Sequence, residues 1–124
     1  MANKEYNLKK RTKEFAHRCV KLALALPLNK LGLHIQGQLI RCSTSTAANY
    51  RACCLSQSKK TFVAKISIAL EEADESVFWM EFAVDEKLIS EQRVKELIVE
   101  GKELTSIFIA SRKTARKNKL FIAQ

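Results

Sequence analysis

The residues of this chain with the greatest capacity for metal binding are four cysteines and two histidines: Cys19, Cys42, Cys53, Cys54, His17 and His34. Structural zinc sites usually take their ligands from close pairs such as Cys-x2-Cys. Only Cys53 and Cys54 are close together here, and adjacent positions of a helix do not face the same side. We therefore expect no metal site, and the histidines to be surface residues.

Covalent and acid–base chemistry is also poorly supported. A nucleophilic serine at Ser43 or Ser45 would need a base held in place by an acid, and no histidine lies nearby in the sequence. The carboxylates that follow at residues 71–75 lack the Glu-x-x-His pattern of di-iron helical bundles. We therefore predict no catalytic residue, no cofactor and no enzyme activity.

The charge of the chain is its most informative chemical property. Lysine and arginine total 22 against 13 acidic residues, which gives a formal net charge of +9. Such an excess favours anionic partners, namely nucleic acid, an acidic protein or a membrane surface. No apolar run approaches the roughly 20 residues that a membrane span requires, and no apolar secretory core follows the basic N-terminus. A cytoplasmic protein with reduced thiols is the expectation.

Apolar side chains recur at steps of three and four along most of the chain, which is typical of amphipathic helices. The pattern predicts helices over about residues 7–26, 33–55, 59–86 and 90–113, with Ser58 and Ser90 as N-caps. A basic tail with a short apolar end covers residues 114–124. With only three glycines and one proline, residues 1–124 are predicted to form one all-α domain, an antiparallel up-down-up-down four-helix bundle.

This topology predicts where the cations gather. The start of the first helix, the turn between the second and third, and the end of the fourth share one end of such a bundle. We therefore predict a nucleic-acid surface there, formed by Lys9, Lys10, Arg11, Lys13, Arg51, Lys59, Lys60, Arg112, Lys113, Arg116 and Lys117, with Lys119 beyond them. Phosphates would be its target. The alternative, that these side chains are solvated singly, stays open.

The centre of the second predicted helix is unusually polar, and it runs from Arg41 to Arg51 without a carboxylate. Antiparallel pairing places Arg41 level with Glu75 and near Glu72, whereas Arg51 has no acidic partner. We define the predicted structural seam as the set of six residues Arg41, Ser43, Ser45, Asn49, Glu72 and Glu75. In one interpretation, the small residues let this helix approach its neighbours closely, and Asn49 makes a buried hydrogen bond. In the other, this helix lies at the centre of an oligomer and packs on several sides. One of Phe78 and Trp79 should face another helix or subunit.

Residues 40–52, 58–76 and 78–81 carry a family resemblance, with Arg41, Ser43, Ser45 and Asn49 matching an Arg-x-Ser-x-Ser-x-x-x-Asn motif. Over about residues 10–112 the chain resembles the bacterial S23 proteins, which are encoded in intervening sequences of 23S rRNA genes. The resemblance implies a four-helix bundle that assembles into a homopentamer. It also implies kinship with accessory proteins of diversity-generating retroelements, basic pentamers that bind nucleic acid and a reverse transcriptase. Many members have Ala-Glu-Gly after the asparagine, where this chain has Arg51-Ala52-Cys53.

Three functions remain open from the sequence. The leading hypothesis is a non-enzymatic homo-oligomer that binds the backbone of RNA or DNA through clustered lysines and arginines. The second is a protein-interaction scaffold for a partner such as a nucleic-acid enzyme. The third, an enzyme or metalloprotein, has the least support from the residues described above.

Overall fold

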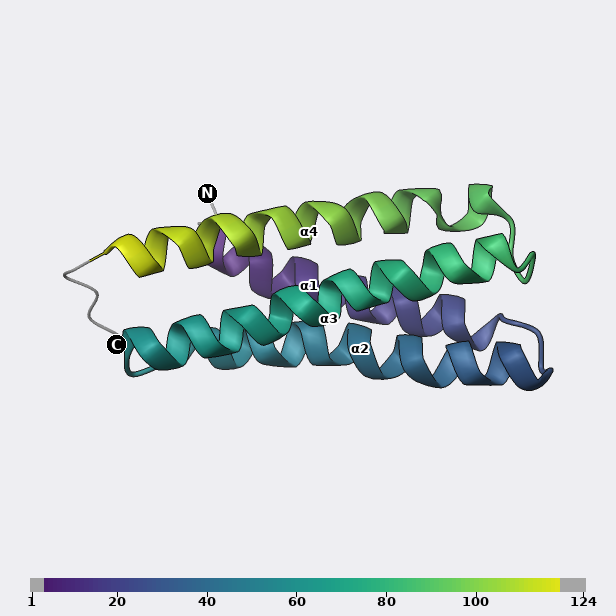
Figure 1. The fold of residues 1–124 in the computed structure, drawn as a ribbon, viewed down its shortest axis with the longest axis horizontal. Coiled ribbons are helices and arrows are strands. Elements are labelled where there is room, and N and C mark those ends of the chain that lie inside the picture. The colour runs from purple at the N-terminus through teal and green to yellow at the C-terminus, as the bar shows by residue number, and fades with distance from the viewer. Residues whose placement is uncertain (1–3, 119–124) are drawn as a thin grey trace.

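The computed structural model describes the backbone of residues 4–118 and the side chains of residues 8–118, and it contains four long helices. They are α1 (Lys4–Leu24), α2 (Lys30–Cys54), α3 (Lys59–Asp85) and α4 (Glu91–Lys117). Successive helices run in opposite directions, and short turns join them at alternate ends (Figure 1). The predicted all-α, up-down-up-down bundle is confirmed. Lys119 and the rest of the predicted tail, residues 119–124, lie outside the described residues.

The core follows the predicted stripes closely. Phe15 of α1, Leu39 of α2, Met80 of α3 and Phe108 of α4 are at most 1% exposed, and they join one continuous apolar cluster. Tight packing of α2 with α3 and of α3 with α4 is helped by buried alanines and by Gly101. A methyl group on Gly101 would lie 2.6 Å from a methyl of Val77, so only glycine lets α4 approach α3 this closely.

Helix α2 begins three residues earlier than predicted. Asn29 is its N-cap, and the side-chain oxygen of Asn29 accepts a hydrogen bond of 2.7 Å from the backbone N–H of Gly32. The sequence pattern placed Gly32 in the connector after Pro27. Its absent side chain instead allows close approach, because a Cβ there would lie 1.9 Å from the backbone oxygen of Pro27.

The other helix ends differ from prediction by small amounts. Helix α1 ends at Leu24 rather than 26, although Leu26 is still buried. Ser58 caps α3 as predicted, accepting from the backbone N–H of Thr61. Ser90 occupies the N-cap position of α4, but its side chain makes no capping bond.

Helix α4 continues to Lys117, four residues beyond the prediction. Ala115 is buried at 5% exposure and extends the apolar stripe past Phe108. Part of the predicted basic tail, residues 114–117, is therefore helical. Within residues 4–118, none of the helices is long and apolar enough to cross a membrane.

Candidate nucleic-acid interface

The start of α3 and the end of α4 are joined by a hydrogen bond between two basic residues. The Nζ of Lys59 donates to the backbone oxygen of Arg116 over 2.8 Å. A lysine suits this position because the last carbonyls of a helix carry partial negative charge. The bond brings together the two predicted basic groups at this end of the bundle.

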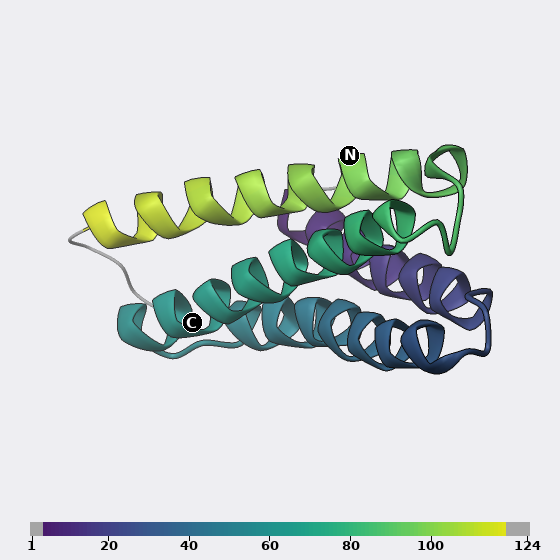
Figure 2. The same cartoon turned by 45° about the vertical axis from the view of Figure 1, so that its right-hand side comes forward.

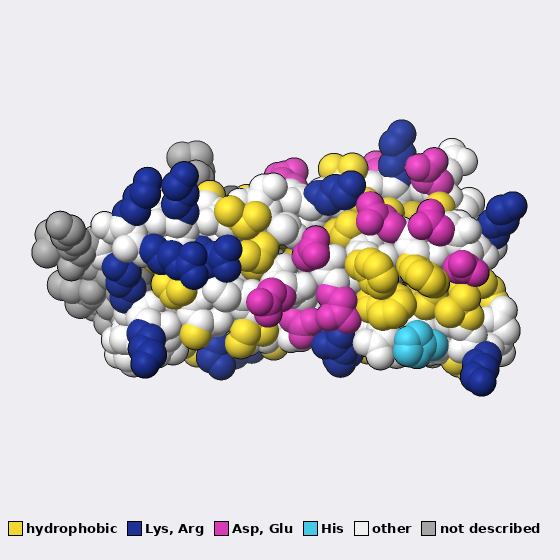
Figure 3. All heavy atoms as spheres, viewed as in Figure 1, with side chains coloured by type: hydrophobic (Ala, Val, Ile, Leu, Met, Phe, Trp, Pro, Cys, Tyr) yellow, Lys and Arg dark blue, Asp and Glu magenta, His cyan; other side chains and the backbone are white. Residues whose placement is uncertain are grey.

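We call this cluster the basic end, formed by Lys59, Lys60, Lys113, Arg116 and Lys117. Lys59 is half-buried and the other four side chains are exposed. None of the five makes an ion pair with a carboxylate in the part of the chain that the structure describes. Lysines and arginines crowd the left end of the molecule in Figure 3, whereas acidic side chains gather towards its middle. Arg112, also predicted for this surface, is half-buried and donates to the hydroxyl of Ser67 over 3.2 Å.

Arg11 is one of the predicted surface residues that do not belong to the basic end. Its guanidinium donates to both carboxylate oxygens of Glu100, at 2.8 and 3.1 Å, and to Glu103 at 3.0 Å. The hydrogen bond to Glu100 raises the pKa of Arg11, and both carboxylate charges add to that effect. Arg11 therefore ties α1 to α4 and is not a cation left free for a ligand. Sequence spacing could not show this, because it depends on how α1 is rotated and tilted against α4.

The same ion pair shows that α1 lies inward of the basic end. Arg11 is level with residues 100–103 of α4, more than two helical turns before Arg112. Figures 1 and 2 show α1 beginning well inside the end at which α4 finishes. The three basic groups therefore form two surfaces rather than the single one predicted.

The second basic surface borders a groove between α1 and α2 of about 380 Å³. Lys9 and Lys13 of α1 and Arg51 of α2 line it, and all three are exposed. Lys10 is exposed on α1 but does not line the groove. No ion pair to Lys9, Lys13 or Arg51 occurs among the described side chains, in agreement with the prediction that Arg51 lacks an acidic partner.

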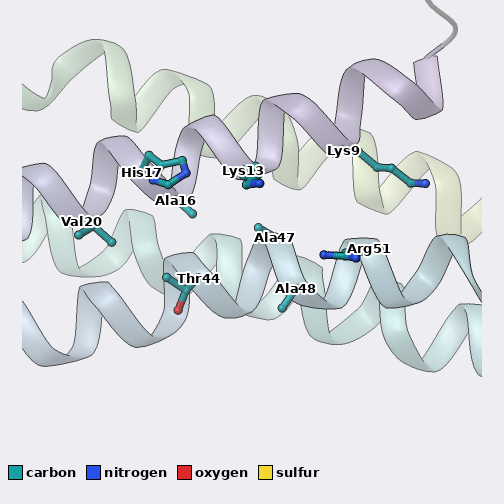
Figure 4. A pocket seen from close by; sticks show the side chains of 9 residues that line it. All are labelled: Lys9, Lys13, Ala16, His17, Val20, Thr44, Ala47, Ala48 and Arg51. Atoms are coloured by element: carbon teal, nitrogen blue, oxygen red, sulfur yellow. The ribbon is translucent and has the colours of Figure 1, made fainter.

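Short side chains create this α1–α2 groove. Helix α1 contributes Lys9, Lys13, Ala16, His17 and Val20, and α2 contributes Thr44, Ala47, Ala48 and Arg51. Each set follows one side of its helix, because its members are spaced by one, three or four residues. Figure 4 shows the two rows facing each other, with Ala16 and Ala47 between the two helices. The hydroxyl of Thr44 donates to the backbone oxygen of Ile40 at 2.7 Å, so its own helix satisfies it.

The acidic half of the predicted seam is confirmed. Arg41 donates to both oxygens of Glu72, at 3.1 and 3.3 Å, and also pairs with Glu75. Glu75 in turn accepts a hydrogen bond of 3.0 Å from the indole nitrogen of Trp79. Arg41 therefore joins α2 to α3.

The prediction of a buried Asn49 hydrogen bond is wrong, whereas the alternative, that this helix lies at the centre of an oligomer, stays a prediction. The residues that continue the buried row of α2 are Tyr50 and Cys53, and the Tyr50 ring stacks on Phe108 with centroids 5.6 Å apart. Asn49 is half-buried and donates to the backbone oxygen and hydroxyl of Ser45, at 2.9 and 3.0 Å. A strict seven-residue repeat places Asn49 on the inward side of α2. The 3.6 residues per turn of an α-helix bring Tyr50 inward instead. Ser43 is fully buried, as a packing residue should be, and Ser45 is half-buried.

The aromatic residues of α3 form a surface away from the basic end. Trp79 is partly buried and its ring meets His34 edge-on at 5.4 Å between centroids, while Phe78 is 49% exposed. Phe82 packs beside both rings. Trp79 therefore faces a neighbouring helix, as one of the two aromatics was predicted to do, and Phe78 faces outward.

The family model for the 23S rRNA-intervening sequence protein matches residues 4–110 of this chain. The chain belongs to this family. Its fold is also similar to the crystal structure of a protein with unknown function from the S23 ribosomal protein family of Bacteroides thetaiotaomicron. The TM-score is 0.79 at 30% identity, and the match covers 85% of this chain and 97% of that chain. No curated protein matches the sequence.

The motif residues Arg41, Ser43, Ser45 and Asn49 do not line the groove and do not belong to the basic end. Arg41 and Ser43 of the motif hold α2 against its neighbours, as described above. The groove residues Val20, Thr44 and Ala48 were not singled out from the sequence, and His17 was considered only as a metal ligand. Their helical spacing beside Lys13 and Arg51 is the signal that could have found them, because it puts short and basic side chains on one side of each helix.

Proposed function

We propose that this S23 family protein is a non-enzymatic, homo-oligomeric helical bundle that binds the phosphate backbone of RNA or DNA. The basic end is the observation that carries the proposal. Five lysines and arginines from α3 and α4 gather there without carboxylate partners among the described residues.

The energetics of the basic end favour an external polyanion. Lys113 and Lys117 are four residues apart on α4, and like charges at that spacing destabilise a helix by about 0.2–0.5 kcal/mol. Lys60 and Arg116 add to the same field. A polyanion would relieve this repulsion and release its own counterions, which is the main source of sequence-independent nucleic-acid binding.

Filter binding of a labelled single strand and a labelled duplex at increasing salt tests the proposal. The logarithm of the association constant should fall linearly with the logarithm of salt concentration, with a slope of about −0.7 to −0.9 per phosphate contacted. No binding at low salt, or binding that salt does not change, would contradict the proposal.

Self-association is supported by the aromatic surface of α3. Phe78 is 49% exposed and packs beside the rings of Trp79 and Phe82, and exposed apolar patches often mark contact surfaces. The family resemblance favours a pentamer. Light scattering on nuclease-treated protein should give a multiple of the chain mass, and a monomer at all concentrations would count against self-association.

The second candidate function is a scaffold for a partner protein, such as a nucleic-acid enzyme. The same outward-facing Phe78 favours it, because a second protein could cover that ring. The two candidates differ in what remains bound after purification. A scaffold would retain its partner after nuclease treatment, whereas nucleic-acid binding alone would leave only this chain.

A further inference from the structure

The α1–α2 groove has a chemistry that backbone binding alone does not require. Phosphate recognition needs only cations, yet this groove sets Lys9, Lys13 and Arg51 beside apolar side chains, Ala47 and Val20 among them. Its volume of about 380 Å³ lies within the range of small-molecule sites. A ligand that fits it therefore carries negative charge and also presents an apolar, compact group.

We propose that the α1–α2 groove binds an unpaired nucleotide of a single strand, with the base over the alanines and the phosphates on the three cations. This inference rests on the proposed function and names its substrate class. In a duplex the bases are paired and stacked, so they present phosphates but no free apolar face to the groove. In a single strand each base exposes such a face.

Two side chains that line the groove, His17 and Arg51, can also stack on a base. His17 and Arg51 lie towards opposite ends of the row in Figure 4. Imidazole rings and guanidinium planes are among the groups on which unpaired bases stack. Such stacking tolerates any sequence, because every base has a π-face.

The charge pattern selects the same ligand. Among the side chains of residues 8–118, no carboxylate lines the groove, and Lys9 and Lys13 are one turn apart, about 6 Å along the helix axis. Two cations in a row on α1 and a third across the groove on α2 suit a chain of phosphates. The groove therefore distinguishes single strands from duplexes, whereas the basic end binds both.

The test compares two oligonucleotides of equal length and charge, one with bases and one fully abasic. The native protein should bind the strand with bases about tenfold more tightly, since one stacked base contributes roughly that factor. Ala48 lines the groove and is exposed on α2. Ala48→Leu therefore adds a larger side chain to the groove, and the charge stays the same because both residues are neutral. This variant should lose the preference for bases and keep its affinity for duplex.

The matched control is Ala64→Leu, the same substitution on the exposed side of α3 outside the groove. It should bind both oligonucleotides as the native protein does. Equal binding of the two strands by native protein, or an unchanged preference in Ala48→Leu, would overturn the groove assignment while the proposed function stands. Binding to neither strand nor duplex at low salt would overturn both. The abasic comparison uses native protein, so it remains decisive if the variant fails to fold.

Discussion

At the scale of single residues, the arginines show how the structure assigns roles that composition cannot. Arg11 and Arg41 each pair with two glutamates, so they hold helices together. Arg51 has no such partner within residues 8–118, and it lines the groove. The pairing of Arg41 could be predicted, because antiparallel numbering places it beside acidic residues of α3. The pairing of Arg11 could not, because α1 and α4 are far apart in sequence and their tilt decides the register.

Buried thiols give a residue-scale prediction. Cys42 is fully buried, its sulfur lies 3.2 Å from the hydroxyl of Ser76, and burial raises its pKa from 9.0 to about 11. The folded core favours the neutral thiol, so its stabilising effect is complete below pH 9. That effect is lost as the pH rises from about 9 through 11.

Chemical unfolding of native protein between pH 8 and 11 should therefore show a loss of stability of about 3 kcal/mol or less from Cys42, since each pKa unit corresponds to about 1.4 kcal/mol. Cys42→Ala should show a shallower decline in stability over the same pH range, because residue 42 then has no thiol that can ionise. Identical pH dependence in the two proteins would refute this account of Cys42.

At the scale of elements, the helices and their buried faces were predictable, and the errors have local causes. Apolar spacing identified all four helices because each must bury a stripe. Pro27 and Gly32 were interpreted together as a connector, although Gly32 lies in the first turn of α2 and contacts Pro27 closely. The end of α4 was placed too early because Ala115, which continues its stripe, is a weak apolar signal.

Two glycines of α2 allow a matched test of the close approach between Gly32 and Pro27. Gly32→Ala should destabilise the protein by about 1–3 kcal/mol, because its Cβ would overlap the backbone oxygen of Pro27. Gly37→Ala should stabilise it by about 0.5–1 kcal/mol, because no atom lies within 4 Å of the added Cβ and alanine favours a helix. Thermal unfolding of both variants measures the difference. Equal effects of the two substitutions would show that helix propensity alone decides them.

At the scale of the whole molecule, charge is separated along the bundle. Topology alone predicted that the α2–α3 turn and the end of α4 share one end, and the bond from Lys59 to Arg116 confirms it. Topology could not predict which side of each helix carries its cations. Lys9, Lys13 and Arg51 instead line the groove between α1 and α2. The basic residues that topology predicted as one surface thus fall into two groups.

The most direct measurement is the affinity for nucleic acid of two variants that have equal net charge. One carries Lys60→Gln, Lys113→Gln and Lys117→Gln at the basic end. The other carries Lys21→Gln, Lys30→Gln and Lys95→Gln, which are exposed near the opposite end of the bundle. We predict that the basic-end variant loses at least tenfold in affinity for duplex and has a salt slope smaller by up to about 3, while the control changes less than threefold. Equal losses in the two variants would contradict the account, because net charge alone would then explain binding.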